Sequence, residues 1–362
     1  MNVALLTSAR SWRGSGVSFV HTARGLAAGG HTVELLATAP EVTAGFKAAG
    51  LTVRELAIHD TGLAEARILV RALRRSQADV LIADKPRDVR LGALASFVRG
   101  FALVYKYLLN RAAPVRDPIM RLAYRRVALT VFLTETSERE VLERARFMGR
   151  APHRVIYEGV DTDLFRPDQE AGRAFRERQG WGVGPVLLAV GAVEWEKRYD
   201  WLLAALARLR APAPVLVIRG SGSLEGATRA QAARLGLDVR FLGFLAPLEL
   251  RSAYNAATCV VHAGAVETFG LTVAEAMACG RPVAAVSSGG VPEVLGDTGV
   301  LAPSDDAAQF AAAVGALLGD PERRAALGAA ARHRAVAAFS LERMGREYCE
   351  AVEALHGRRA RA

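Results

Sequence analysis

The chain has 362 residues, 51% of them hydrophobic and 23% charged, which is typical of a soluble protein with one or two sizeable cores. No apolar run reaches the roughly 18–20 residues that cross a bilayer. The N-terminus lacks the basic flank of a secretion signal, so its apolar stretch is interpreted as a strand. Three cysteines without metal-type spacing are interpreted as packing thiols and favour a reducing cytoplasm.

The charge is concentrated in one part of the chain. Residues 66–150 contain 18 Lys and Arg against 8 Asp and Glu, a surplus of ten that equals the net charge of the whole chain, +10. A basic half beside a neutral half indicates an acidic partner, such as nucleic acid, an anionic membrane or a phosphorylated acceptor. An arginine-rich surface without a specific partner is the alternative.

Strand-length apolar runs alternate along the chain with longer segments of helical period, which is the signature of βα units and parallel sheets. The first half holds predicted strands at 2–8, 32–38, 78–84, 102–107 and 128–134, with a helix at 16–31. The second half holds predicted strands at 185–192, 214–220, 238–244, 258–264 and 281–287, each followed by a helical segment. The pattern predicts an α/β protein with two Rossmann-like domains.

The boundary between these domains is predicted at 158–168, a stretch rich in Asp, Gly and Pro without a clear period. We therefore expect a first domain over 1–160 and a second over 161–340. Ligands of such sheets bind beyond the carboxyl ends of the strands. We expect two such edges to face each other across a cleft that takes a nucleotide-type ligand.

Two carboxylates mark the most informative stretch, "VETFGLTVAEAMACGRPVAAVSSGGVPEV" at 266–294. Glu267 follows a predicted strand and Glu275 lies on the helix predicted at 270–278. The first backbone N–H groups of a helix favour an anion; here they belong to Thr268, Phe269, Gly270 and Leu271. Carboxylates beside a bound diphosphate accept hydrogen bonds from hydroxyls, which predicts a nucleotide-sugar. The alternative is that Glu267 interacts only with the helix dipole and that Glu275 is a solvated residue on the helix surface.

This stretch resembles the E-x7-E signature of retaining glycosyltransferases of the GT-B fold, in glycosyltransferase family 4 (glycosyl transferases group 1). The match includes "EAMACG", "RPVAAV" and "GGVPEV". Further stretches resemble the same family: "GAVEWEKRYDWLLAAL", "EGVDTDLFRP", "VIRGSGSLEG", "RFLGF" and, near the start, "SARSWRGSGVSFV". The resemblance is strong over 155–300 and loose over 1–150.

The resemblance implies roles for individual residues. Glu267 orients the donor sugar, Glu275 holds the ribose, and Lys197 with Arg198 neutralises the diphosphate. The family often has an arginine where this chain has Ala192, and Arg198 is expected to replace that charge. Further donor contacts are implied at Gly14, Gly16, Gly220, Gly222, Phe244, Thr268, Phe269, Gly270 and Leu271.

The acceptor side is less well marked. Asp84, Lys85 and Arg87 follow a predicted strand and are candidate acceptor contacts, or else a solvated loop. Many relatives have a histidine after the fourth strand of the first domain, whereas 102–111 contains none. His262 is interpreted as a packed or capping histidine. The final helix, within 341–362, resembles one that packs back on the first domain.

The sequence thus predicts a cytoplasmic, retaining glycosyltransferase that needs no metal or cofactor. Its donor is expected to be a UDP- or GDP-sugar. Its acceptor is a hydroxyl of an envelope glycan, a lipid-linked sugar or a small molecule. The basic first domain suggests peripheral contact with an anionic membrane, and no nucleic acid is expected. The alternatives are a non-catalytic nucleotide-sugar-binding homologue and an NAD-dependent oxidoreductase, although no G-x-G-x-x-G directly follows a strand.

Overall fold

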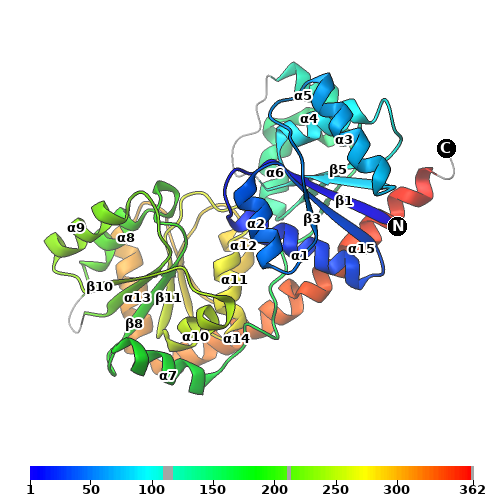
Figure 1. The fold of residues 1–362 in the computed structure, drawn as a ribbon. Coiled ribbons are helices and arrows are strands. Elements are labelled where there is room, and N and C mark those ends of the chain that lie inside the picture. The colour runs from blue at the N-terminus through cyan, green and yellow to red at the C-terminus, as the bar shows by residue number, and fades with distance from the viewer. Residues whose placement is uncertain (109–116, 210–212, 360–362) are drawn as a thin grey trace. The chain divides into compact units, whose positions relative to one another are not determined.

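The computed structural model describes residues 1–108, 117–209 and 213–359 (Figure 1). The end of the histidine-free stretch 102–111 and the last residues of 341–362 lie outside the described residues. The chain divides into two compact units. The first unit contains residues 1–159 and 341–362, and the second unit contains residues 160–340.

The first unit is built on a parallel seven-stranded sheet with the order β3-β2-β1-β4-β5-β6-β7. Its elements, in chain order, are β1 (Asn2–Thr7), α1 (Gly14–Ala28), β2 (Thr32–Ala37), α2 (Pro40–Ala48), β3 (Val53–Glu55), α3 (Leu63–Arg75), β4 (Val80–Ala83), α4 (Pro86–Ala95), β5 (Ala102–Tyr107), α5 (Pro118–Tyr124), β6 (Val127–Phe132), α6 (Glu135–Arg144), the 3-10 helix η1 (Arg146–Arg150), β7 (His153–Val155) and α15 (Leu341–Arg359).

The second unit is built on a parallel six-stranded sheet with the order β10-β9-β8-β11-β12-β13. Its elements are α7 (Gln169–Gln179), β8 (Val186–Val190), the 3-10 helix η2 (Trp195–Lys197), α8 (Tyr199–Leu206), β9 (Val215–Arg219), α9 (Glu225–Leu235), β10 (Val239–Gly243), α10 (Pro247–Ala256), β11 (Cys259–His262), α11 (Leu271–Ala278), β12 (Val283–Val286), α12 (Val291–Leu295), β13 (Val300–Ala302), α13 (Ala307–Gly319) and α14 (Pro321–Phe339).

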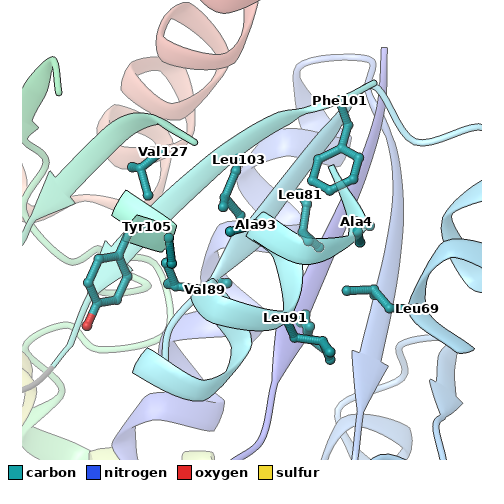
Figure 2. Close-up of a cluster of buried hydrophobic side chains, with 14 of the residues drawn as sticks. Ala4, Leu69, Leu81, Val89, Leu91, Ala93, Phe101, Leu103, Tyr105 and Val127 are labelled. Carbon is teal, nitrogen blue, oxygen red and sulfur yellow. The ribbon is translucent and has the colours of Figure 1, made fainter. Parts of the chain in front are cut away.

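Helices cover both faces of each sheet (Figure 1), which explains why the central strands are buried on both faces and mostly apolar rather than alternating. Every residue of β4, β5, β11 and β12 is buried. Figure 2 shows part of the core of the first unit, where Leu81 and Leu103 of the sheet lie beside Val89 and Leu91 of α4. An added methyl group at Gly92 of α4 would lie 2.8 Å from Leu103, so this helix packs close to the sheet.

The predicted fold class is confirmed: the chain forms two α/β units with parallel sheets. Each of the ten predicted strands corresponds to a strand of the structure. The strands β3, β7 and β13 were not predicted. Each has three residues and lies at the edge of its sheet, and a run of that length is too short to show a period.

The helix α15 follows the whole second unit in sequence yet packs against α1 in the first unit (Figure 1). The two helices meet at glycines, because an added methyl group at Gly25 would lie 2.6 Å from the Cα atom of Gly345. Among the described helices, none is both long enough and apolar enough to cross a bilayer.

Candidate functional site

The strand order of the second unit reverses direction between β8 and β11, which lie side by side in the sheet. In open parallel sheets the loops at such a reversal leave in opposite directions and open a ligand-binding crevice at the carboxyl ends of the strands. The loop after β8 leads to Lys197, and the loop after β11 carries Glu267. The topology therefore brings these two predicted site residues together.

Lys197 and Glu267 form an ion pair, with Lys197 Nζ donating a hydrogen bond to Oε1 of Glu267. Both side chains are largely buried, at 22% and 13% exposure. Burial acts to raise the pKa of Glu267, but the charge of Lys197, the neighbouring His262 and the hydrogen bond from Lys197 together outweigh it and hold the pKa below its ordinary value. Glu267 is therefore an anion, ready to accept hydrogen bonds.

His262, the last residue of β11, is buried beside this pair, as predicted for a packed histidine. Its Nε2 atom lies 3.5 Å from Oε1 of Glu267. Burial lowers the pKa of the ring to about 4, although Glu267 acts to raise it. The imidazole is therefore neutral at pH 7 and does not act as a second cation beside Glu267.

Glu275 lies on α11 and accepts a hydrogen bond of 2.7 Å from the hydroxyl of Tyr254. Burial raises the pKa of Glu275 to about 7, and the Tyr254 hydrogen bond and the charge of Arg219 only partly offset it. This carboxyl group therefore changes charge near neutral pH, unlike Glu267.

Gly270 is the N-cap residue directly before α11. Its φ of 97° lies in the left-handed region that favours glycine. Leu271 and Thr268 are partly buried. The side chain of Phe269 is buried and packs edge-on against Phe339 at 5.4 Å. Phe269 can therefore meet a ligand only through its backbone, which is the contact that was predicted for it.

The glycine turn after β9 packs directly on the loop after β8. An added methyl group at Gly220 would lie 1.9 Å from the carbonyl oxygen of Gly191, and one at Gly222 would lie 2.3 Å from that of Val193. Side chains at these positions would push the two loops apart.

Phe244, after β10, is 75% exposed.

Arg198 does not join Lys197. Its Nη1 atom donates a hydrogen bond of 2.6 Å to the carbonyl oxygen of Ser304, and its guanidinium stacks at 4.7 Å over Trp201. Its role with the diphosphate stays a prediction. Of these two basic residues, Lys197 contacts Glu267 and Arg198 contacts Ser304.

Arg219 and Tyr254 were not predicted as site residues. Arg219 ends β9, stacks at 4.7 Å over Phe244 and donates a hydrogen bond from Nη2 to Leu245 O. Among the described residues its buried Nε atom has no hydrogen-bond partner. The sequence signal was available, since a basic residue stands directly before Gly220 at a strand end. Tyr254 carries no such signal, because a tyrosine at helical spacing is typical of a core.

The remaining predicted residues lie in the first unit. Gly14 opens α1, and Gly16 lies in the same turn. Asp84 follows β4, is fully buried, and has an oxygen 3.1 Å from Lys85 Nζ. Arg87 donates to Thr38 Oγ1 over 2.9 Å. These side chains are thus held in place rather than free in a solvated loop, and Asp84 positions Lys85 instead of exposing its own oxygens.

A neighbouring acid, Asp88, is also buried and accepts a hydrogen bond of 2.8 Å from the backbone N–H of Ser8. Burial and the adjacent Asp84 raise the pKa of Asp88 to about 7. Within the ranges that the structure describes, no three His, Cys, Asp or Glu residues converge in a way that could hold a metal ion.

Two family models match the chain. "Glycosyltransferase Family 4" matches residues 12–164, and "Glycosyl transferases group 1" matches residues 173–334. A D-inositol 3-phosphate glycosyltransferase of Catenulispora acidiphila is 32% identical, with 98% of this chain and 96% of that protein covered. A GDP-mannose-dependent alpha-(1-6)-phosphatidylinositol monomannoside mannosyltransferase of Mycolicibacterium smegmatis is 35% identical, with 67% of this chain and 66% of that protein covered. The match to a D-inositol 3-phosphate glycosyltransferase of Thermobispora bispora spans 59% of its length.

Solved structures show the same fold at low identity. HepE of Anabaena in complex with UDP-glucose has a TM-score of 0.83 at 21% identity, with 97% of this chain and 99% of that chain covered. Sucrose-phosphate synthase of Thermosynechococcus elongatus has a TM-score of 0.81 at 21% identity, with 98% and 99% covered. Together with the family matches and the two parallel-sheet units, these similarities show that the chain belongs to the GT-B glycosyltransferases of group 1 and family 4.

Proposed function

We propose that this protein transfers a sugar from a UDP- or GDP-sugar to an acceptor hydroxyl with retention of anomeric configuration and without a metal ion. The observation that carries the proposal is the Lys197–Glu267 pair, which lies where β8 and β11 end and directly before the N-terminus of α11. A cation, a carboxylate and a helix N-terminus in one place suit a diphosphate with a sugar attached.

In the proposed complex the donor diphosphate lies on the first backbone N–H groups of α11. Lys197 leaves Glu267 for the diphosphate, and Glu267 then accepts hydrogen bonds from the sugar hydroxyls. Glu275 holds the ribose hydroxyls, with Tyr254 fixing its orientation. The Lys197–Glu267 pair of the free protein keeps both charges compensated until the donor arrives.

The proposed reaction takes place on one face of the sugar. The bond between the anomeric carbon and the diphosphate oxygen breaks, and the acceptor oxygen bonds to that carbon on the same face. The acceptor proton passes to the departing phosphate oxygen, so no side chain acts as base. Lys197 and the α11 N-terminus stabilise the charge that grows on the diphosphate.

The acceptor is proposed from the relatives and from the charge of the first unit. One relative is named for D-inositol 3-phosphate and another for a phosphatidylinositol mannoside. We propose an anionic polyol or lipid-linked envelope acceptor, met in the cytoplasm or at the inner membrane face. Lys85 and Arg87 are its candidate contacts.

A non-catalytic nucleotide-sugar-binding homologue is the second candidate. The observations that favour it are Ala192 in the place of an arginine and the engagement of Arg198 by Ser304. Both leave Lys197 as the single cation that contacts Glu267 in the described arrangement.

The test is a panel of UDP- and GDP-sugars, with NAD as the control, read by calorimetric binding. A preferred donor is then incubated with inositol phosphate and lipid-linked sugars in the presence of EDTA, and the product anomer is assigned by NMR. Binding of one donor class and a product of unchanged configuration support the proposal. An inverted product or a strict metal requirement would overturn the mechanism, and donor binding without transfer to any acceptor would favour the non-catalytic homologue.

A further inference from the structure

A second pocket lies in the first unit, away from the predicted site residues. It has a volume of about 660 Å³ and lies between α5 and η1. Four arginines line it, together with four largely apolar residues: Arg121, Arg125, Arg146, Arg150, Pro118, Leu122, Tyr124 and Phe147. All four arginines are exposed. So many guanidinium groups around one hollow create a positive potential that attracts phosphate.

Three of the four arginines have no acidic partner among the described residues. Among the described residues, no carboxylate oxygen lies within 4 Å of the side-chain nitrogens of Arg125, Arg146 or Arg150. Asp117, just before α5, is engaged by Arg90 at 3.2 Å and caps the helix by accepting from Met120 N–H. The three arginines are therefore available to an external anion.

The same helix exposes apolar side chains. Ile119 and Leu122, one turn apart on α5, are 63% and 64% exposed. The opposite face of α5 is anchored in the core by Met120, Ala123 and Tyr124. Exposed aliphatic side chains next to a row of arginines are typical of protein surfaces that sit in a lipid headgroup layer, whereas nucleic acid offers no apolar layer for them.

The position of the pocket separates it from sugar transfer. The C-terminal end of α5 leads into β6, and η1 leads into β7. The pocket thus lies toward the amino-terminal ends of these strands, while ligands of parallel sheets react at the carboxyl ends. A surface here can be occupied without blocking that edge.

We propose that this arginine pocket docks the protein on an anionic phospholipid bilayer. Arg125, Arg146 and Arg150 hold headgroup phosphates, while Ile119 and Leu122 enter the layer between headgroups and acyl chains. The inference concerns attachment alone, and vesicle binding tests it independently of donor binding and transfer.

The experiment compares binding of the full chain to vesicles of phosphatidylcholine alone and of phosphatidylcholine mixed with phosphatidylglycerol. We expect binding to the mixed vesicles only. Each arginine near an anionic surface strengthens binding by a factor of about five. The triple variant Arg125→Gln, Arg146→Gln, Arg150→Gln should therefore bind about a hundredfold more weakly. Leu122→Ser should weaken binding about tenfold with no change in net charge.

The matched control removes three arginines from α3 of the same unit: Arg67→Gln, Arg71→Gln, Arg74→Gln. These side chains are exposed, but the apolar face of α3, including Leu69, Val70 and Leu73, is buried in the core. We expect at most about a threefold loss, since charge at a distance is screened beyond about 10 Å in salt. Thermal unfolding of each variant confirms that it is folded.

Three results would overturn the proposal. The α3 variant could lose as much vesicle binding as the pocket variant, which would mean that only overall charge matters. Soluble glycerol phosphate could displace the protein from vesicles, while Leu122→Ser binds vesicles as tightly as the unmodified protein. That result would indicate a site for small phosphates. Single-stranded RNA could bind the full chain more tightly than vesicles do, with the same loss in the pocket variant.

Discussion

Lys197 and Glu267 compensate each other's charge in a largely buried place, so the loss of either side chain leaves the other charge unpaired. We expect Lys197→Met and Glu267→Gln each to lower kcat/KM by about 10²–10³, because each removes a contact to the part of the donor where charge develops. The double variant should be only slightly worse than either single variant, because residues in contact act as a unit.

Steady-state kinetics and urea unfolding of the three variants check this. The exposed Lys47→Met, in the first unit, is the control and should match the unmodified protein. Additive losses in the double variant, equal to the sum of the single losses in free energy, would show that the two side chains act separately.

Glu275 gives the site a pH dependence. Its pKa rises from 4.5 in the unfolded chain to about 7 in the folded protein. The folded state therefore retains a proton that the unfolded state releases, so this group's contribution to stability falls as pH rises from about 4.5 to 7. Glu275→Gln should thus be more stable than the unmodified protein at pH 8, by on the order of 1–3 kcal/mol, and equal to it at pH 4.

The same variant should bind the donor more weakly at pH 8, by about tenfold, because an amide accepts the ribose hydrogen bonds less strongly than a carboxylate. Urea unfolding and calorimetric binding at both pH values measure these effects. The exposed Glu177→Gln should change neither. Equal stability of Glu275→Gln and the unmodified protein at pH 8 would contradict the raised pKa.

The site could be predicted as a set of residues but not as a set of contacts. The signature around Glu267 and Glu275 resembles a family whose members share those positions, so their place in chain order was readable. The orientation of the Arg198 side chain could not be predicted, because it depends on contacts with Trp201 and Ser304 that form only in the folded protein. Arg219 carries a signal in the sequence, a basic residue directly before Gly220, but the four preceding residues of its strand are typical of a core.

The crossing of α1 and α15 rests on two glycines. In Gly25→Ala the new methyl group would meet the backbone of Gly345 at 2.6 Å. We expect a loss of about 1–3 kcal/mol in unfolding free energy, the usual cost of overpacking. In a helix, alanine is more stable than glycine by about 0.5–1 kcal/mol. The sign of the change in unfolding free energy therefore tests the contact between the helices.

The matched control is Gly315→Ala in α13, where the nearest atom to an added methyl group is 3.5 Å away. That variant should be slightly stabilised, since only the helix preference changes. Thermal unfolding of both variants gives the comparison. A stabilised Gly25→Ala would show that the two helices are further apart than described.

Among the elements, long central strands could be predicted and short edge strands could not. A strand such as β5, with six buried residues, differs clearly from its neighbours in the sequence. The three residues of β13 become a strand only because β12 offers free backbone partners. Pairing of this kind is set by the neighbouring strand, not by the residues that join it.

The molecule has a separate hydrophobic core in each unit. We therefore expect calorimetry to resolve two unfolding transitions. UDP or GDP at a hundred times its dissociation constant should stabilise the unit that binds it by about 2.7 kcal/mol. Because Lys197, Glu267 and Glu275 belong to the second unit, only one transition should move, and Gly25→Ala should lower the other.

Calorimetric scans with and without nucleotide measure this directly. A single transition that shifts as a whole would show that the two units unfold together. A nucleotide effect on the transition that Gly25→Ala lowers would place the donor contacts in the first unit.

The chain leaves the first unit after Gly159 and returns to it at Leu341, so the second unit is an uninterrupted insertion. Met344, Tyr348 and Val352 of α15 belong to a core that also contains residues of β1, α1 and β5. During translation, strands β1 to β7 leave the ribosome long before this helix does, and one apolar face stays uncovered until the inserted segment has been made. Domains usually complete in order from the N-terminus; here the whole second unit must be synthesised before the first unit can bury its last apolar face.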